Sequence, residues 1–271
     1  MALLTNNLTV KNGVKKIANL FGIDLIKLKK KMSMGSRKSN RLTFYKTATG
    51  NYYLPTDAVD DIVAKSIKSN KIFEQEVVDL ARKYIKPNTT VLDLGANFGQ
   101  MSILFSEMVG ERGKVHSFDA DDWVYEIFCK NIQANNKIDK IIPHFGAVHN
   151  KKDEVLVFPN HDFEDHNSYG SYGIDYNALE GRKVKTITID SLNIEDSISF
   201  IKIDIQGGDL QAMQGAIKTI AKNKCPILFE YEYHFEDKFN MCFQDYVDFV
   251  NSIDYKFHKV ISGHNFLIIP K

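Results

Sequence analysis

A glycine-bracketed turn, followed at a distance by an acidic residue, is the arrangement in this chain that most directly indicates ligand chemistry. Residues Thr89 to Gln100 read TTVLDLGANFGQ, an apolar run that ends at Gly95 and Gly99 and opens into a helical pattern. The glycines let the backbone approach a ligand, and the start of the helix favours polar or anionic groups. Asp119 follows at the spacing of a ribose-binding acid, whose carboxylate accepts hydrogen bonds from both hydroxyls of an adenosine.

Two adenosine cofactors fit this outline, a dinucleotide and S-adenosylmethionine. The dinucleotide fingerprint needs a glycine where this chain has Asn97, and a glycine or alanine where it has Gln100. S-adenosylmethionine has no phosphate for the turn to bind, so a looser turn suffices. The turn therefore predicts an S-adenosylmethionine site, and the alternative is an ordinary strand, turn and helix without a ligand.

Ligands of open α/β sheets bind beyond the carboxyl ends of the strands, which selects the remaining cofactor-binding candidates. Gly95 and Asn97 are assigned to the methionine part, Asp119 to the ribose and Ala147 to the adenine. Asp93 is expected to orient the turn or the cofactor's amino group. The predicted cofactor-binding residues are Asp93, Gly95, Ala96, Asn97, Gly99, Asp119, Ala147 and Gln206.

The same rule selects catalytic candidates after the later strands. Asp204 ends an apolar strand, where a carboxylate is costly unless it has a role or a partner. Methyl transfer to a hydroxyl needs a base, and Asp204 or His234 can supply one. Alternatively, Asp204 and Glu232 can hold Mg²⁺ or another divalent cation that polarises the hydroxyl. Glu230 lies at the end of the same fifth core strand as Glu232 and has no assigned role. The competing interpretation is that the carboxylates lie at the surface and that the histidine is solvated.

The elements that must position these residues alternate between strand and helix from Thr89 onward, which predicts a doubly wound α/β fold with a parallel sheet. The chain closes with YKFHKVI and FLIIP around Gly263, a terminal antiparallel hairpin. We therefore expect a mostly parallel, seven-stranded sheet of the class I methyltransferase type. VKTITIDSL is expected as a further strand at an edge, and residues 210–221 as one helix.

Residues 150–180 break this alternation. A short strand, VLVFP, precedes HDFEDHNSYGSYGIDY, which is rich in glycine, serine, tyrosine, histidine and aspartate. Long loops within a domain are usually functional, and the aromatic content favours a substrate-facing insertion. His161 and His166 are further catalytic candidates in this loop.

The first fifty residues form a separate extension in this interpretation, followed by the methyltransferase domain at 51–271. Residues 14–28 combine helical apolar spacing with many lysines, which predicts a basic amphipathic N-terminal helix. Such a helix docks on the domain, on a second copy of the chain to give a homo-oligomer, or peripherally on an anionic membrane. Two alternating runs around residues 49–51 predict a β-hairpin beside it.

Composition bounds the remaining classes. The 271 residues are 44% hydrophobic, enough for a full core, and their formal net charge of +1 gives no field that favours a nucleic-acid partner. Three cysteines without metal spacing indicate core thiols in a reducing compartment. We expect neither a transmembrane segment nor a signal peptide, hence a cytoplasmic protein.

The ordered motifs of residues 51–271 resemble the FkbM-type S-adenosylmethionine-dependent methyltransferases. They are YYLP, FEQE, VLDLGANFG, SFDADD, NIQANN, GAVHN, TITIDSL, FIKIDIQGGDLQAMQGA and CPILFEYE. Two positions depart from the family pattern. Asp119-Ala120 replaces Glu-Pro, and the fourth-strand motif has Gln206 and Asp209 where the family has glutamates.

The resemblance implies methyl transfer to oxygen, commonly on a hydroxyl of a glycan, nucleotide-sugar or glycosylated natural product. An amine, carboxylate or nucleic-acid base is the alternative acceptor. Amine and base methylation on this scaffold often uses an Asn/Asp-Pro-Pro-aromatic run, whereas the chain has Asp204-Ile205-Gln206-Gly207. The remaining alternative is a non-catalytic module that binds the cofactor or a partner.

Overall fold

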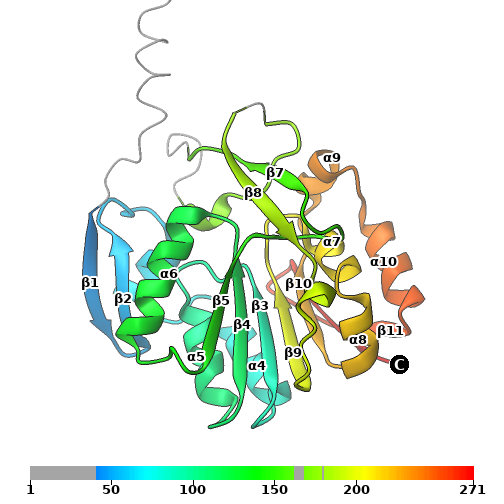
Figure 1. Ribbon diagram of the computed structural model, residues 1–271, viewed down its shortest axis with the longest axis horizontal. Coiled ribbons are helices and arrows are strands. Elements are labelled where there is room, and N and C mark those ends of the chain that lie inside the picture. The colour runs from blue at the N-terminus through cyan, green and yellow to red at the C-terminus, as the bar shows by residue number, and fades with distance from the viewer. Residues whose placement is uncertain (1–40, 162–167, 179) are drawn as a thin grey trace, which may run out of the picture.

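Seven strands form the central sheet of the computed structural model, which describes residues 41–161, 168–178 and 180–271 (Figure 1). The predicted N-terminal helix lies outside the described residues. The strands are β3 (Thr90–Leu94), β4 (Lys114–Asp119), β5 (Ile141–Phe145), β9 (Ile198–Ile203), β10 (Ile227–Glu230), β11 (Tyr255–Ile261) and β12 (Asn265–Pro270). Their order is β11-β12-β10-β9-β3-β4-β5. Neighbours from β10 to β5 are parallel and β12 is antiparallel to both β10 and β11, which confirms the predicted fold class.

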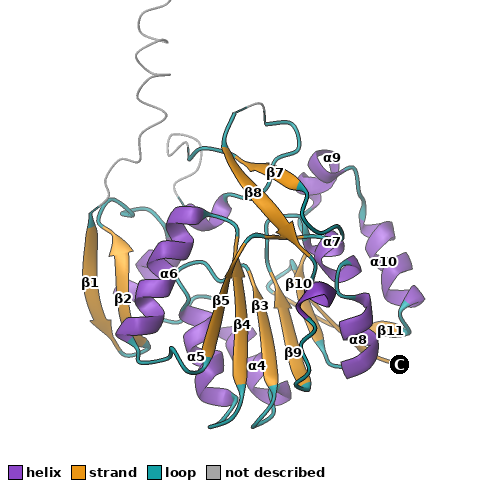
Figure 2. Ribbon diagram, viewed as in Figure 1, coloured by secondary structure: helices purple, strands orange, loops and turns teal. Residues whose placement is uncertain are grey.

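Helices cover both faces of this sheet, and each face has its own apolar cluster (Figure 2). The first face packs against α3 (Ile62–Lys68), α4 (Gln75–Tyr84), α5 (Gln100–Met108) and α6 (Asp122–Ala134). The second packs against α7 (Asp209–Gln214), α8 (Ile217–Asn223) and α10 (Phe243–Ser252). Every residue of β3 and β9 is buried, because these central strands are covered on both faces.

The predicted β-hairpin is present, with β1 (Leu42–Thr47) paired antiparallel to β2 (Gly50–Pro55). It lies beside α6 (Figure 1), and the buried Asn131 joins the two. The side-chain amide of Asn131 donates to the carbonyl oxygens of Phe98 at 2.9 Å and Tyr53 at 3.2 Å, and its oxygen accepts from the Tyr53 N–H at 2.6 Å. The predicted domain boundary after residue 50 separates β1 and the first residue of β2, Gly50, from the rest of β2.

Residues 146–187 form a second, smaller sheet of β6 (Ala147–Val148), β8 (Arg182–Ile187) and β7 (Val155–Phe158), in that order. The prediction that VKTITIDSL lies at an edge of the main sheet is therefore wrong. The chain bends at Gly146, where a Cβ atom would lie 2.5 Å from Ile187 Cδ1, so β5 ends there and β6 pairs with β8 instead. Across this sheet, β7 pairs antiparallel to β8.

The helix predicted over residues 210–221 is also divided, into α7 and α8. The break falls at Gly215, where a Cβ atom would lie 2.0 Å from the carbonyl oxygen of His149. The remaining elements are short: η1 (Tyr169–Ser171), η2 (Ile189–Leu192), η3 (Tyr233–Phe235) and α9 (Glu236–Phe239). Among the described residues, no helix has the length and apolar character needed to cross a membrane.

Candidate functional site

The turn after β3 passes between two neighbouring strands, and this passage explains its first glycine. The N–H groups of Gly95 and Ala96 both donate to the carbonyl oxygen of Phe118, at 3.0 and 2.8 Å. A Cβ atom on Gly95 would lie 1.8 Å from the carbonyl oxygen of Asp204, and the residue has a φ of +87°. Glycine is therefore required where the backbones of β3 and β9 diverge.

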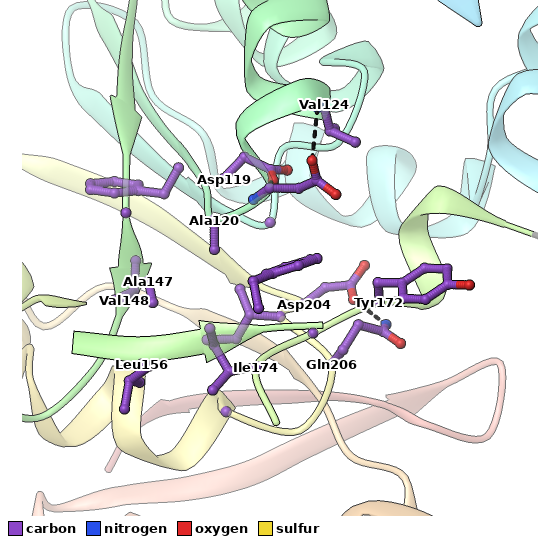
Figure 3. A pocket seen from close by; sticks show the side chains of 18 of the residues that line it. Asp119, Ala120, Val124, Ala147, Val148, Leu156, Tyr172, Ile174, Asp204 and Gln206 are labelled. Atoms are coloured by element: carbon purple, nitrogen blue, oxygen red, sulfur yellow. Dashed lines mark hydrogen bonds between the residues drawn. The ribbon is translucent and has the colours of Figure 1, made fainter. Parts of the chain in front are cut away.

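A cavity of about 810 Å³, open solvent at its mouth included, lies beyond the carboxyl ends of β3, β4 and β9 (Figure 3). Its walls are mainly apolar. They include Phe118, Ala120, Val124, Ala147, Val148, Leu156, Phe158, Tyr172 and Ile174. Figure 3 shows Asp119 and Ala120 on one side, with Leu156 and Ile174 across from them. We call this space the first cavity; its shape and lining suit a flat, apolar ring system attached to a polar group.

Asp119 supplies the polar group of this cavity. One carboxylate oxygen accepts from the N–H of Asn97 and the other from the N–H of Asp121, both at 2.9 Å. Burial and the neighbouring charge of Asp121 raise the pKa of Asp119 to about 7. Each oxygen retains a lone pair, so the carboxylate can accept two further hydrogen bonds.

Asp121 attaches the 150–180 insertion to the main domain. Its carboxylate caps α6 by accepting from the N–H groups of Trp123 and Val124. It also accepts from Arg182 of β8 at 2.8 and 3.1 Å, and lies 2.5 Å from His161 Nε2. Burial alone would raise the pKa of Asp121, but these partners hold it well below its usual range. His161 thus has a structural contact, and His166 lies outside the described residues.

A second cavity, of about 970 Å³ with its open mouth, adjoins the first. The two share Gly95, Asn97, Gly170, Asp204 and Gln206. The lining of the second cavity is more polar, with Glu74, Gln100, Ser168, Ser171, Lys202, Glu230, Glu232 and His264. Asp204 and Gln206 therefore stand where two differently lined cavities meet, an arrangement that can bring two substrates together.

Lys202 lines the second cavity beside this junction, with its side chain 5% exposed. Its ammonium group is 3.0 Å from the carbonyl oxygen of Gly95, 3.4 Å from Asp204 and 3.6 Å from Asp93. Burial alone would lower the pKa of Lys202, but the surrounding carboxylates raise it, so the residue is charged at neutral pH. Sequence reasoning missed Lys202, although a lysine within the apolar run FIKIDI is itself a signal of a buried ion pair.

A carboxyl pair faces the second cavity beside this lysine. The side-chain amide of Gln206 donates to Asp204 at 3.2 Å and to Glu230 at 3.3 Å. Burial and the charges of Asp204 and Asp209 raise the pKa of Glu230 well above its usual range. Glu230 is therefore protonated at neutral pH, and it had no assigned role in the sequence interpretation. Glu74 and His264 line the same cavity and were also missed, because their elements lie far away in the sequence.

Three predicted site residues line neither cavity of the described structure. Asp93 is fully buried, and its carboxylate accepts from the Ser102 hydroxyl at 2.5 Å. Gly99 precedes α5 with a φ of +87°, and a Cβ atom there would lie 2.4 Å from the Phe128 ring. His234 has a side chain 54% exposed and lies 3.6 Å from Glu232. The other predicted residues, Gly95, Ala96, Asn97, Asp119, Ala147, Asp204, Gln206 and Glu232, line one cavity or both.

The carboxylates proposed to hold a divalent cation do not form a metal-binding cluster. Asp204 and Glu232 line the same cavity. Within residues 41–161, 168–178 and 180–271, however, no group of three or more histidine, cysteine, aspartate or glutamate side chains is arranged to hold a metal ion. The arrangement gives no support to a resident metal.

The strand order, with its antiparallel β12, and a carboxylate at the end of the second parallel strand are those of an S-adenosylmethionine-dependent methyltransferase of class I. The family model described as "Methyltransferase FkbM domain" matches residues 93–257. That match covers more than half of the chain, so the protein belongs to the FkbM methyltransferase family.

Solved structures with a similar fold are distant in sequence. The FkbM methyltransferase from Methylobacillus flagellatus KT is 17% identical, with a TM-score of 0.45; the match covers 71% of this chain and 50% of that one. Aeropyrum pernix fibrillarin, solved with natively bound S-adenosyl-L-methionine, is 9% identical, with a TM-score of 0.43 and coverage of 87% and 85%. Precorrin-6y C5,15-methyltransferase from Geobacter metallireducens GS-15 is 13% identical, with a TM-score of 0.40 and coverage of 73% and 89%. Among curated proteins, none matches the chain.

Proposed function

We propose that this methyltransferase acts on oxygen, methylating a hydroxyl of a sugar, nucleotide-sugar or glycan. The observation that carries the proposal is the junction of the two cavities, where Asp204 borders both. The first cavity is the proposed donor site and the second is the proposed acceptor site. Gln100, Ser168, Ser171 and the carboxyl groups of the second cavity supply several hydrogen-bonding partners, which suits an acceptor with many hydroxyls.

The donor site has a part for each portion of S-adenosylmethionine. We assign the adenine to the apolar walls around Ala147 and the ribose hydroxyls to Asp119. The turn formed by Gly95, Ala96 and Asn97 faces the methionine portion. Asp93 and Gly99 would act beneath this surface, because Asp93 contacts Lys202 and Gly99 allows α5 to pack against Phe128. The bound cofactor supplies an activated methyl group on a positively charged sulfur.

Asp204 is the proposed general base. The acceptor hydroxyl oxygen forms a bond to the methyl carbon as the carbon–sulfur bond breaks, and the hydroxyl proton passes to the Asp204 carboxylate. Lys202 lies 3.4 Å from Asp204, and Glu230 already holds its own proton. His234 was the alternative base, and its exposed position outside both cavities gives that role no support.

Assistance by Mg²⁺ or another divalent cation at Asp204 and Glu232 remains a second hypothesis, and it makes a different prediction. A metal-assisted enzyme would lose methyl transfer on treatment with a chelator and regain it with added Mg²⁺. A base-catalysed enzyme would keep its activity.

The proposed catalytic domain spans 51–271. The 150–180 insertion has Tyr172 in the wall of the donor cavity and Ser171 in that of the acceptor cavity.

Calorimetry with S-adenosylhomocysteine, with and without Mg²⁺, tests the donor site first. Affinity on the order of micromolar is expected for a class I site of this size. Methyl transfer from labelled S-adenosylmethionine to sugars, nucleotide-sugars and glycans then tests the acceptor, and mass spectrometry shows whether oxygen or nitrogen is methylated. Binding without transfer by the wild-type protein to any acceptor would favour the non-catalytic alternative. No binding would contradict the donor site.

A further inference from the structure

The acceptor cavity has an unbalanced charge. Its described lining contains four carboxyl groups: Glu74 before α4, Asp204 after β9, and Glu230 and Glu232 at and after the end of β10. Glu230 holds a proton, so the negative charge belongs to Glu74, Asp204 and Glu232. Lys202 is the one lysine or arginine among the described residues that line it. Lys202 is already engaged by Asp93, Asp204 and the carbonyl oxygen of Gly95. It is therefore not a free cation for a ligand.

This charge distribution opposes an anionic acceptor. A phosphate or carboxylate group entering the cavity would meet carboxylates from three different elements and would find Lys202 already paired. Like charges within a few ångströms repel each other strongly in a partly buried site, because water screens them less there. Among the acceptors of the proposed function, nucleotide-sugars are therefore disfavoured by their diphosphate.

The position of Glu74 is the second relevant observation. It lines the same cavity as Glu232 but from a different element, at the start of α4, with a φ of +49°. This left-handed conformation is unfavourable for a residue other than glycine. Its carboxylate is held in place by the Asn265 amide at 3.1 Å. The fold thus keeps a carboxylate at this wall although both its backbone conformation and its negative neighbours are unfavourable.

We propose that the acceptor carries a protonated amine beside the hydroxyl that is methylated, as in an amino sugar, and that Glu74 and Glu232 bind this ammonium group. The proposal rests on the proposed O-methyltransferase function and narrows its acceptor class. An ammonium group has three N–H donors that can reach carboxylates on separate walls. A metal ion needs ligands that converge on one point, which the described side chains do not provide.

The same contacts determine which atom is methylated. Carboxylates around an amine stabilise its protonated form, and the nitrogen of an ammonium group has no lone pair with which to attack. The hydroxyl near Asp204 keeps its lone pairs and has a base beside it. Methylation is therefore expected on oxygen although the acceptor contains an amine.

Binding to the full-length protein saturated with S-adenosylhomocysteine tests this proposal. The probes are D-glucosamine, N-acetyl-D-glucosamine and D-glucose 6-phosphate, titrated by calorimetry with a chelator present. Glucosamine is expected to bind at least about tenfold more tightly than the other two, with an affinity that falls as salt is added. The substitution Glu232→Gln should remove most of this preference while S-adenosylhomocysteine affinity stays unchanged. Glu111→Gln, at an exposed position, is the matched control.

Each other outcome has a distinct meaning. Equal binding of glucosamine and its N-acetyl form, or tighter binding of the phosphate, would overturn the ammonium site while leaving the O-methyltransferase proposal intact. Glucosamine binding that requires Mg²⁺ would assign the carboxylates to a metal ion and overturn it as well. Methylation on nitrogen would contradict both proposals. Failure to bind S-adenosylhomocysteine would contradict the donor site itself.

Discussion

Asp119 links cofactor binding to pH. Its pKa of about 7 means that roughly half of the carboxyl groups are protonated at neutral pH in the free enzyme. Ribose hydroxyls donate to the ionised form, so binding should lower this pKa and release a proton. The affinity for S-adenosylhomocysteine is therefore expected to rise from about pH 6 to pH 7, by up to about tenfold per unit, and to level off above pH 7.

The effect of Asp119 on folding has the opposite sign. A carboxyl group with a raised folded-state pKa contributes stability that is fully present below its unfolded pKa of about 4 and is lost as pH rises through about 7.

Calorimetry with S-adenosylhomocysteine at several pH values checks the prediction that Asp119 makes binding depend on pH. Asp119→Asn is the control, because it keeps the shape of the side chain but does not titrate. A pH dependence that survives in this variant would refute the assignment.

Asp204 and His234 are distinguished by their places relative to the cavities. Asp204→Asn is expected to lower kcat by about a hundredfold or more, because the base is lost, with little change in S-adenosylhomocysteine affinity. His234→Ala should leave kcat within about twofold, since His234 lines neither described cavity. Steady-state kinetics with the best acceptor measures both. A large loss in His234→Ala would restore histidine as the base.

A residue could be predicted to line the site from the sequence only where its own backbone position restricts the residue type. Gly95 was predicted to bind the cofactor, and it lines both cavities at a turn between diverging strands that requires glycine. His234 was chosen because it follows the fifth core strand. β10, however, ends at Glu230 and the chain turns into η3, so distance along the sequence no longer indicates which way a side chain points. The protonated state of Glu230 depends on Asp204 and Asp209 of other elements, and no local pattern contains it.

At the level of elements, the Asp121 carboxylate connects the insertion to α6. Asp121 of the α6 cap accepts from Arg182 of β8, and the Arg182 guanidinium also stacks over Phe158 at 4.9 Å. Arg182→Met would keep the packing but remove the charge. We expect it to cost about 1–3 kcal/mol of stability and to weaken S-adenosylhomocysteine binding, because β7 contributes Leu156 and Phe158 to the donor cavity.

Thermal unfolding and calorimetry test this anchor. Lys183→Met on the same strand is the matched control, because Lys183 is exposed and should tolerate the change. If Arg182→Met lowered stability but left S-adenosylhomocysteine affinity at the wild-type value, the insertion would not depend on this contact to form the donor cavity.

Asn131 performs a similar function for the hairpin. It bonds Phe98 at the turn and Tyr53 in β2, so one buried amide joins three parts of the chain. Asn131→Ala leaves buried backbone groups without partners and is expected to cost about 2–3 kcal/mol. Thermal denaturation measures the loss against Gln133→Ala, an exposed position of the same helix. Equal melting temperatures would show that water replaces these hydrogen bonds.

The helices and strands were easier to predict than the segments with which they pair or pack. The strand and helix alternation from residue 89 gave the right fold class because buried strands and amphipathic helices have distinct periods. It did not show that residues 182–187 pair with β6 and β7, because a strand pattern carries no information on its neighbour. Nor did it show the break at Gly215, which depends on the approach of His149.

At the level of the whole molecule, the two cavities collect residues from segments that lie far apart in the sequence. Glu74 precedes the first core strand and His264 lies in the last turn, yet both line the acceptor cavity. The carboxyl ends of the parallel strands bring these segments to one edge of the sheet. This convergence explains why Glu74 and His264, which lie outside the strand ends used to select site residues, were missed in the sequence.

The whole-molecule architecture also tests where the domain begins. The predicted boundary after residue 50 would remove β1, which pairs with β2 at six positions from Leu42–Pro55 to Thr47–Gly50. Leu42 and Tyr45 of β1 pack against the main apolar cluster. A fragment of residues 51–271 would lose these contacts and leave β2 with an unpaired edge, which also favours aggregation.

We therefore expect the fragment 51–271 to be less stable than the fragment 41–271 by about 2 kcal/mol, a decrease in melting temperature of about 4–8 °C. Both fragments keep every residue that lines the two cavities, so S-adenosylhomocysteine should bind each of them below its melting temperature. Thermal unfolding with and without this ligand separates stability from site integrity. Equal melting temperatures would support the boundary after residue 50, whereas the expected difference would move the start of the domain to the beginning of β1.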